Sequence, residues 1–185
     1  GFYFSIFLAI FSTSFLKRFK YPVFIFWIAN TLYYLLYFLL FEQWGFFSRF
    51  TTIIVYRILK IFYPLSYMIL DGDAIAISVD DFYVGIGKSC SGVTLLLLFV
   101  TLFILFCLLY LRRIKKLVAL LLFILGSLGA FGLNIVRVTV LMFVGTYYPE
   151  FALNLFHDHI SWILFVVYFL IFMYFTHSFI LNTKD

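Results

Sequence analysis

The stretch KSCSGVTLLLLFVTLFILFCLLYL, residues 88–111, decides how this chain is organised. A polar segment that contains Cys90 leads directly into an apolar run of about 20 residues, the length that crosses a bilayer as a helix. The cysteine is therefore predicted to lie at a membrane surface, where the helix begins. A thiol beside Lys88 and at the positive end of a helix is in a setting that favours the thiolate. Cys90 is thus a candidate nucleophile if the rest of the chain brings partners to it.

The composition of the whole chain is that of a membrane protein. Of its 185 residues, 66% are hydrophobic and only 11% are charged. A soluble domain needs more polar surface, so we predict one integral membrane domain over residues 1–185. Cys107 lies 17 positions after Cys90 in the same predicted helix, about 25 Å away, so the two cannot form a disulfide. In a membrane protein, basic residues first indicate orientation in the membrane, so the net charge of +5 does not suggest nucleic acid, and we expect no nucleic-acid partner.

Apolar runs predict five membrane spans, at 2–16, 21–41, 92–111, 117–146 and 158–180. The basic clusters and Lys184, with eight of the thirteen Lys and Arg residues, then lie on one side of the membrane, and seven of the eight acidic residues lie on the other. Basic connections are typical of the cytoplasmic side. The arrangement therefore predicts a multi-pass protein of the cell membrane (plasma or inner) in which Cys90 faces outward.

The segment 46–89 must then begin and end on the outer side, so it is not a span. Basic residues within 46–62 agree, because a charge in mid-span costs about 2.5–3.5 kcal/mol. We predict an interfacial helix over 46–62 and, from the period-two pattern around Asp80 and Asp81, a small outer β-hairpin. The predicted fold class is an all-α polytopic membrane protein, a bundle of about five transmembrane helices with these two outer elements.

Two polar residues in the fourth predicted span need a reason. Asn134 and Arg137 are spaced i and i+3 and share one helix face. Arg137 is 21 residues past Lys116, about 31 Å along the helix, near the outer edge of the hydrocarbon. A lone arginine there commonly extends to the lipid headgroups. The adjacent asparagine favours an inward-facing role, as do small residues that let another helix approach closely, namely Gly126, Gly129, Ala130 and Gly132.

A second polar group, His157-Asp158-His159, opens the last span. Each residue alone is simply explained as part of a polar helix start, where Asp158 favours the positive helix end. His177 lies 20 residues further along and is therefore expected on the opposite side of the membrane. His157 and His159 are two apart and face different directions, and no third ligand has suitable spacing, so we expect no metal site and no cofactor.

Three of these residues are predicted to lie at the same depth in the membrane. Cys90, Arg137 and His157 lie on three predicted helices, and counting from the basic clusters puts each near the outer boundary. A nucleophile, a base that takes its proton and a cation that holds developing negative charge are what acyl transfer requires.

The same residues form three motifs that resemble the exosortase and archaeosortase family, polytopic cysteine transpeptidases of bacteria and archaea. The motifs are Cys-Ser-Gly before an apolar helix, Asn-x-x-Arg from Asn134 to Arg137, and Phe-His before a last span with Trp162. The similarity covers about 65–180, and the first two spans match only in being apolar. Val93-Thr94 departs from the Ile followed by Arg or Gln that the family often has, and the spans are fewer than the eight of long members.

The resemblance implies a role for each motif. Cys90 would be the nucleophile, Arg137 an electrostatic stabiliser and His157 the general base or acid. His157 fits the family's Phe-His-acid pattern better than His159, although some archaeal members carry a second Arg there, which leaves the subgroup open. The supporting residues would be Ser91, Asn134, Asp158 and His159.

The resemblance also implies a function and partners. The enzyme would cleave secreted proteins that carry a C-terminal motif, a transmembrane helix and a basic tail, and transfer them to an acceptor such as a membrane lipid. A first alternative is a membrane-surface cysteine protease that only hydrolyses. A second is a non-enzymatic lipid-binding or assembly subunit, in which Arg137 and the interfacial helix hold anionic headgroups.

Overall fold

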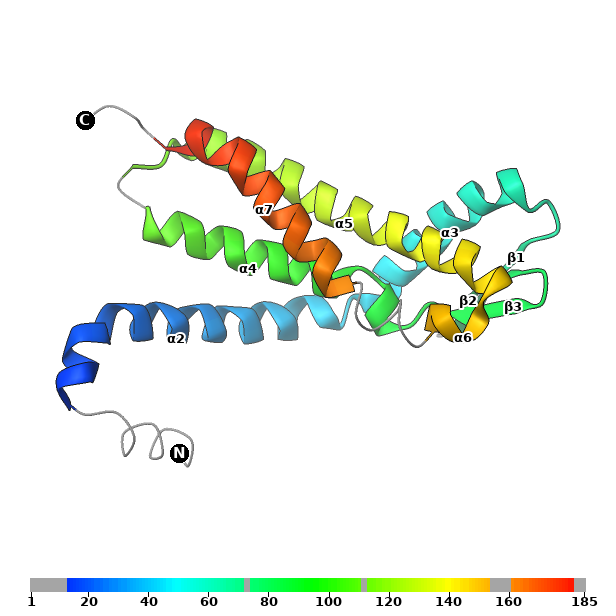
Figure 1. The fold of residues 1–185 in the computed structure, drawn as a ribbon, viewed down its shortest axis with the longest axis horizontal. Coiled ribbons are helices and arrows are strands. Elements are labelled where there is room, and N and C mark those ends of the chain that lie inside the picture. The colour runs from blue at the N-terminus through cyan, green and yellow to red at the C-terminus, as the bar shows by residue number, and fades with distance from the viewer. Residues whose placement is uncertain (1–12, 72–73, 111–112, 154–160, 182–185) are drawn as a thin grey trace.

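The computed structural model of the chain describes residues 13–71, 74–110, 113–153 and 161–181. Long helices dominate, and a small antiparallel sheet lies at one end (Figure 1), so the predicted fold class is confirmed. The elements in chain order are α2 (Thr13–Phe41), α3 (Trp44–Phe62), β1 (Tyr67–Asp71), β2 (Ala74–Val79), β3 (Phe82–Gly85), the 3₁₀ turn η1 (Lys88–Cys90), α4 (Val93–Leu109), α5 (Lys116–Tyr147), α6 (Pro149–Phe151) and α7 (Ser161–Ile180).

Three helices in the described part of the chain are long and apolar enough to cross a membrane, in α2 (Val23–Leu40), α5 (Lys116–Tyr147) and α7 (Trp162–Ile180). The apolar helix α4 has 17 residues and a length of about 26 Å, slightly less than the roughly 30 Å of a hydrocarbon layer. These four helices correspond to four of the five predicted spans. The predicted span 2–16 lies almost entirely outside the described residues.

One predicted boundary lies within a continuous helix. Helix α2 begins at Thr13 and remains helical through the basic cluster at 17–20, and its segment that is apolar enough to cross a membrane, Val23–Leu40, follows that cluster. Lysine and arginine are good helix formers, so a basic cluster that marks a membrane boundary does not by itself end a helix.

Helix α5 joins two separate hydrophobic cores. Its 32 residues extend about 48 Å, well beyond the thickness of the hydrocarbon layer. Near its start it packs with α4 and α7 around Phe99, Phe103 and Phe165. Its later turns pack with α3 and the sheet around Leu59, Ile77 and other buried side chains (Figure 1). We call these the bundle core and the cap core.

The cap contains the predicted β-hairpin and one unexpected strand. β2 and β3 pair in antiparallel fashion through Val79 and Phe82, with Asp80 and Asp81 in the turn, as predicted. β1 adds a third strand, in the order β1-β2-β3. Because four of its five residues are exposed, β1 has no alternating pattern that would predict it.

Helix α3 confirms the amphipathic helix predicted over 46–62. Its buried face consists of Ser48, Thr51, Thr52, Val55 and Leu59, at the spacing of one helix face. This face packs on the sheet and on α5, while its position relative to the membrane remains a prediction.

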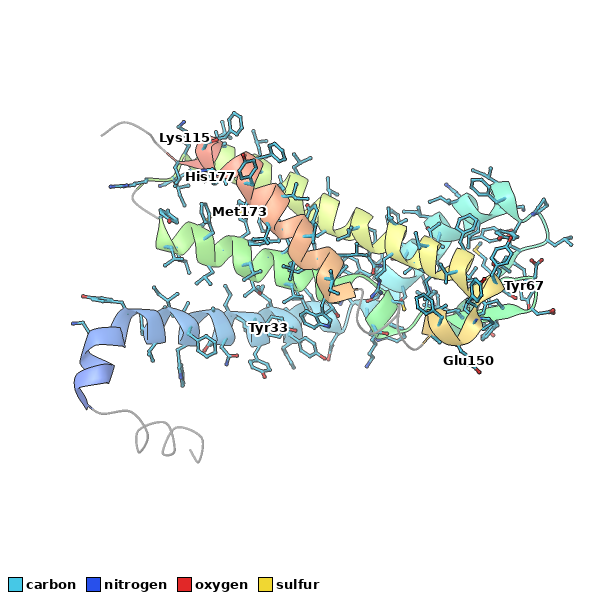
Figure 2. The ribbon with its side chains drawn as sticks, viewed as in Figure 1. Tyr33, Tyr67, Lys115, Glu150, Met173 and His177 are labelled. Atoms are coloured by element: carbon cyan, nitrogen blue, oxygen red, sulfur yellow. The ribbon has the colours of Figure 1, made fainter. Side chains whose placement is uncertain are left out.

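The ends of the molecule differ in character. Figure 2 shows Lys115 and His177 at one end, and Tyr67 and Glu150 at the other. The backbone N–H of Lys115 donates to the carbonyl of Ile180 at 2.9 Å, which joins the start of α5 to the end of α7. His177 therefore lies at the end away from the sheet, as its spacing predicted.

Close packing of α5 depends on two of the predicted small residues. A Cβ added at Gly126 would overlap the rings of Phe99 and Phe172, and one added at Gly129 would overlap Tyr168. The Tyr168 hydroxyl donates to the Gly126 carbonyl at 2.7 Å. Gly132, by contrast, has nothing within 4 Å of an added Cβ, so only part of the predicted series makes the close approach.

These two environments predict opposite effects of the same substitution. Gly126→Ala should lower the free energy of unfolding by about 1–3 kcal/mol, because the aromatic rings must move. Gly132→Ala should leave stability unchanged or raise it by up to about 1 kcal/mol, because alanine is the better helix former. Thermal unfolding of both variants in the same detergent checks the prediction, which fails if the two melt alike.

Candidate active site

The predicted nucleophile lies in a short connection between the sheet and the bundle. Chain order places η1 after β3, and α4 begins three residues after Cys90. The N–H of Cys90 donates to the Gly87 carbonyl at 3.1 Å, which closes the 3₁₀ turn. Cys90 is 1% exposed and belongs to the cap core. Cys90 and Cys107 are not joined by a disulfide, as the spacing required.

The Ser-Gly pair after the cysteine turns the chain into α4. Ser91 donates its hydroxyl to the Lys88 carbonyl at 2.7 Å and accepts from the N–H of Val93 at 3.3 Å. Gly92 has φ +89, a conformation that glycine adopts at little cost. An added Cβ there would lie 2.9 Å from Nδ2 of Asn134, so glycine also permits α5 to approach.

Two side chains of helix α5 bind the 3₁₀ turn that contains Cys90. Asn134 donates from Nδ2 to the Cys90 carbonyl at 3.0 Å, and Arg137 donates from Nη2 to the Ser89 carbonyl at 3.0 Å. The Arg137 guanidinium also lies close enough to the Cys90 side chain to interact with it electrostatically. Asn134 is fully buried and Arg137 is 6% exposed, so the arginine faces inward rather than toward headgroups.

Helix α3 holds the same turn with a second pair of side chains. Thr51 donates to the Ser91 carbonyl at 3.1 Å, and Ser48 donates to the Gly87 carbonyl at a longer 3.5 Å. The Lys88 ammonium lies 5.7 Å from the ring centroid of Trp44, at the start of α3.

Together these contacts satisfy an unbroken run of backbone acceptors. Each of the five carbonyls of residues 87–91, which we call the cysteine segment, accepts a hydrogen bond from a side chain. The donors, in the order of the carbonyls, are Ser48, Ser91, Arg137, Asn134 and Thr51. A segment held at every carbonyl keeps its thiol in one position, which is the requirement for a preorganised nucleophile.

An apolar pocket lies beside this segment, toward the bundle. It has a volume of about 230 Å³ and is lined by Phe46, Phe47, Phe50, Leu96, Ser127, Leu128 and Phe131. Phe131 also lies against Gly92, where an added Cβ would be 3.1 Å from its ring. The pocket is therefore adjacent to the cysteine segment, on the side of the helix bundle.

The predicted site is thus assembled in part. Cys90, Ser91, Asn134 and Arg137 lie together, although 44 positions of sequence separate Cys90 from Asn134. His157, Asp158 and His159 lie outside the described residues. Helix α7, which follows them, packs on α4, where the rings of Phe99 and Phe169 meet edge-on at 6.1 Å between centroids.

Two contacts were missed by reasoning from the sequence. Ser48 and Thr51 were counted only as part of an interfacial helix. Their spacing from Val55 and Leu59 continues the buried stripe of α3 with hydroxyl groups, and this pattern was the available signal.

Comparison with known proteins decides the family. A family model described as transmembrane exosortase matches residues 1–174. The chain belongs to the transmembrane exosortase family. The match covers the segment before residue 65 as well, where the motifs indicated similarity only over about 65–180. Neither a curated protein nor a solved structure matches the chain.

Family membership establishes the coarse function. Exosortases are membrane enzymes of the sorting-protease type, and this exosortase is therefore a multi-pass membrane enzyme.

Gly87, the first residue of the cysteine segment, and Gly92, which directly follows it, predict a contrast in stability. Gly92→Ala should cost about 1–3 kcal/mol in the free energy of unfolding, because alanine is strained at positive φ and would press on Asn134. Gly87→Ala should change it little, since Gly87 has φ −79 and nothing within 4 Å of an added Cβ. Thermal unfolding measures both, and equal losses would contradict the assignment of strain to Gly92.

Proposed function

We propose that this exosortase is a cysteine transpeptidase in which Cys90 forms a thioester with its substrate and Arg137 supplies the positive charge for the reaction. The observation that carries the proposal is that the buried Arg137 guanidinium donates to the carbonyl of Ser89, the residue before Cys90, and lies close enough to the Cys90 side chain to interact with it electrostatically. A cation beside a thiol favours the thiolate, which is the nucleophilic form. The contact therefore supports an activated cysteine rather than a cysteine that only fills space.

The proposed reaction begins with removal of the thiol proton by His157. The thiolate attacks the carbonyl carbon of the scissile peptide bond and forms a tetrahedral oxyanion. When the C–N bond breaks, the leaving amine takes the proton from His157. An amine or hydroxyl acceptor then attacks the thioester, gives its proton to His157 and releases the Cys90 thiolate.

Arg137 has donors for both parts of this cycle. A guanidinium carries five N–H groups, so it keeps its bond to the Ser89 carbonyl while others face the sulfur or the oxyanion. Charge-stabilising donors in a buried site are commonly the largest contribution to acyl transfer. Asn134 acts mainly on the geometry, because its Nδ2 is engaged with the Cys90 carbonyl.

The choice of His157 as the base rests on the sequence motif. It is supported by the position of α7, in which Phe169 packs edge-on against Phe99 in the first half of α4. Helix α7 thus begins, at Ser161, at the end of the bundle where α4 also begins. Asp158 and His159 are proposed as its supporting residues.

The proposed substrates are secreted proteins with a C-terminal motif, a transmembrane helix and a basic tail, and a membrane lipid is one acceptor. We propose the cell membrane as the location, with the site facing outward. The basic end of the molecule at Lys115 lies away from the sheet, in agreement with the positive-inside rule (Figure 2). The apolar pocket beside the cysteine segment suits a substrate whose apolar helix follows the cleaved bond.

The central prediction concerns the nucleophile. Cys90→Ala should reduce processing of a co-expressed secreted protein with such a C-terminal signal by at least about 10³-fold, because no thioester can form. Cys107→Ala, which removes the other thiol, should process normally. Immunoblotting of precursor and product measures both variants, and mass spectrometry of the trapped wild-type enzyme should find an acyl group on Cys90. Normal processing by Cys90→Ala would refute the mechanism.

The fate of the thioester separates transfer from hydrolysis. Transpeptidation leaves the mass of the acceptor on the new C-terminus of the product, whereas hydrolysis leaves a free carboxyl group. Intact-mass analysis of the purified product distinguishes the two outcomes.

A further prediction concerns the replacement of Arg137 by lysine. Arg137→Lys keeps the charge but loses the planar set of donors that reaches Ser89 and Cys90 together, so processing should fall about 10²–10³-fold. The same change at exposed Arg57 in α3 should have no effect. The loss should be in the turnover rate at saturating substrate, and an equal loss in both variants would point to a general effect of charge or expression.

A further inference from the structure

We propose that Thr51 of α3 is a positioning residue for the nucleophile, and that its hydroxyl keeps the Cys90 thiol in the reactive position. This inference rests on the proposed function for its catalytic meaning. Its geometric content, the immobilisation of Cys90 by α3, is independent of which reaction the thiol performs.

The contact of Thr51 differs from an ordinary helix-surface contact in its burial and its target. The side chain is fully buried, and its Oγ1 donates across 40 positions of sequence to the Ser91 carbonyl at 3.1 Å. Ser91 is the residue directly after the nucleophile, and its own hydroxyl holds the turn through Lys88 and Val93. Movement of the Ser91 peptide group would therefore move the thiol and the start of α4 together.

The two helices hold complementary parts of the cysteine segment. The α5 residues bind the inner carbonyls of Ser89 and Cys90, whereas the α3 residues bind the outer carbonyls of Gly87 and Ser91. Of the α3 pair, Thr51 makes the shorter bond, 3.1 Å against 3.5 Å for Ser48. Thr51 is thus the main contact between α3 and the polypeptide that follows the nucleophile.

The next residue provides a matched control. Thr52 is also fully buried on α3, but its Oγ1 has no hydrogen-bond partner among the described residues. Thr→Val has the same shape and removes only the hydroxyl, so the two substitutions differ in one respect. Thr51→Val leaves the buried carbonyl of Ser91 without its side-chain donor, whereas Thr52→Val removes a hydroxyl that makes no hydrogen bond among the described residues.

The test measures the reactivity of Cys90 directly. The full-length protein in detergent is treated with N-ethylmaleimide, and the rate of modification of the Cys90 peptide is followed by mass spectrometry. Because the thiol is 1% exposed, a loosened cysteine segment should be modified faster. We expect Thr51→Val to raise the rate at least about threefold, and Thr52→Val and Thr51→Ser to remain within twofold of the wild type.

A second pair keeps the proposal testable if Thr51→Val does not fold. Thr51→Ser and Thr51→Ala both lose the methyl group and differ only in the hydroxyl, so faster modification in the alanine variant alone supports the positioning role. In the processing assay, Thr51→Val should lower the turnover rate about 10–100-fold with little change in the substrate concentration for half-maximal rate. Thr51→Ser should restore it.

The outcomes separate this inference from the proposed function. The positioning role is overturned if N-ethylmaleimide modifies Cys90 at the same rate in Thr51→Val and Thr52→Val, or if Thr51→Ser behaves like Thr51→Ala. Cys90 is still the nucleophile in that case if Cys90→Ala abolishes processing. If Cys90→Ala processes normally, the proposed function fails, while faster modification in Thr51→Val still establishes that α3 immobilises the thiol.

Discussion

The site depends on one constraint, which is that a buried backbone carbonyl must find a donor. The cysteine segment leaves the sheet and enters α4 without the regular hydrogen bonds of either element. The carbonyls of the buried residues Cys90 and Ser91 would lose free energy if they were left unpaired, and those of the more exposed residues 87–89 are hydrogen-bonded to side chains as well. The chain meets this requirement with side chains from α3, from α5 and from the segment itself. The polar residues that seem out of place in an apolar chain therefore have a common reason.

The same contacts bring the chemistry to the cysteine. Arg137 binds the Ser89 carbonyl and also interacts electrostatically with the Cys90 side chain, so the residue that fixes the backbone also provides the positive charge. Asn134 lies one turn away on α5 and binds the next carbonyl. A fixed nucleophile beside a fixed cation needs little reorganisation during the reaction, which is how polar groups in a buried site contribute to rate.

Much of this could be predicted from the sequence, and the remainder has identifiable physical reasons. Hydropathy predicts α5 and α7 because a membrane span requires a long apolar run. Counting along regular helices places Cys90 and Arg137 at one depth, because the rise per residue is constant. Depth does not determine which way a side chain faces, and that depends on packing at positions such as Gly126. The exposed edge strand β1 has no pattern to detect, and the hydroxyl of Thr51 gains its meaning only when α3 lies against the cysteine segment.

The length of α5 has a consequence for how this protein can be divided or changed. Because one helix runs through both cores, the cap cannot be detached as a soluble module, and the membrane bundle cannot be kept without it. Asn134 and Arg137 lie on α5 between the residues that serve the bundle core and those that serve the cap core. Insertion or deletion of a single residue in the first half of α5 would rotate them, together with the cap-core residues that follow, by about 100° relative to the bundle core. Length variation among related enzymes is therefore expected in the connections and in the terminal helices, while the number of residues between Gly126 and Met142 stays constant.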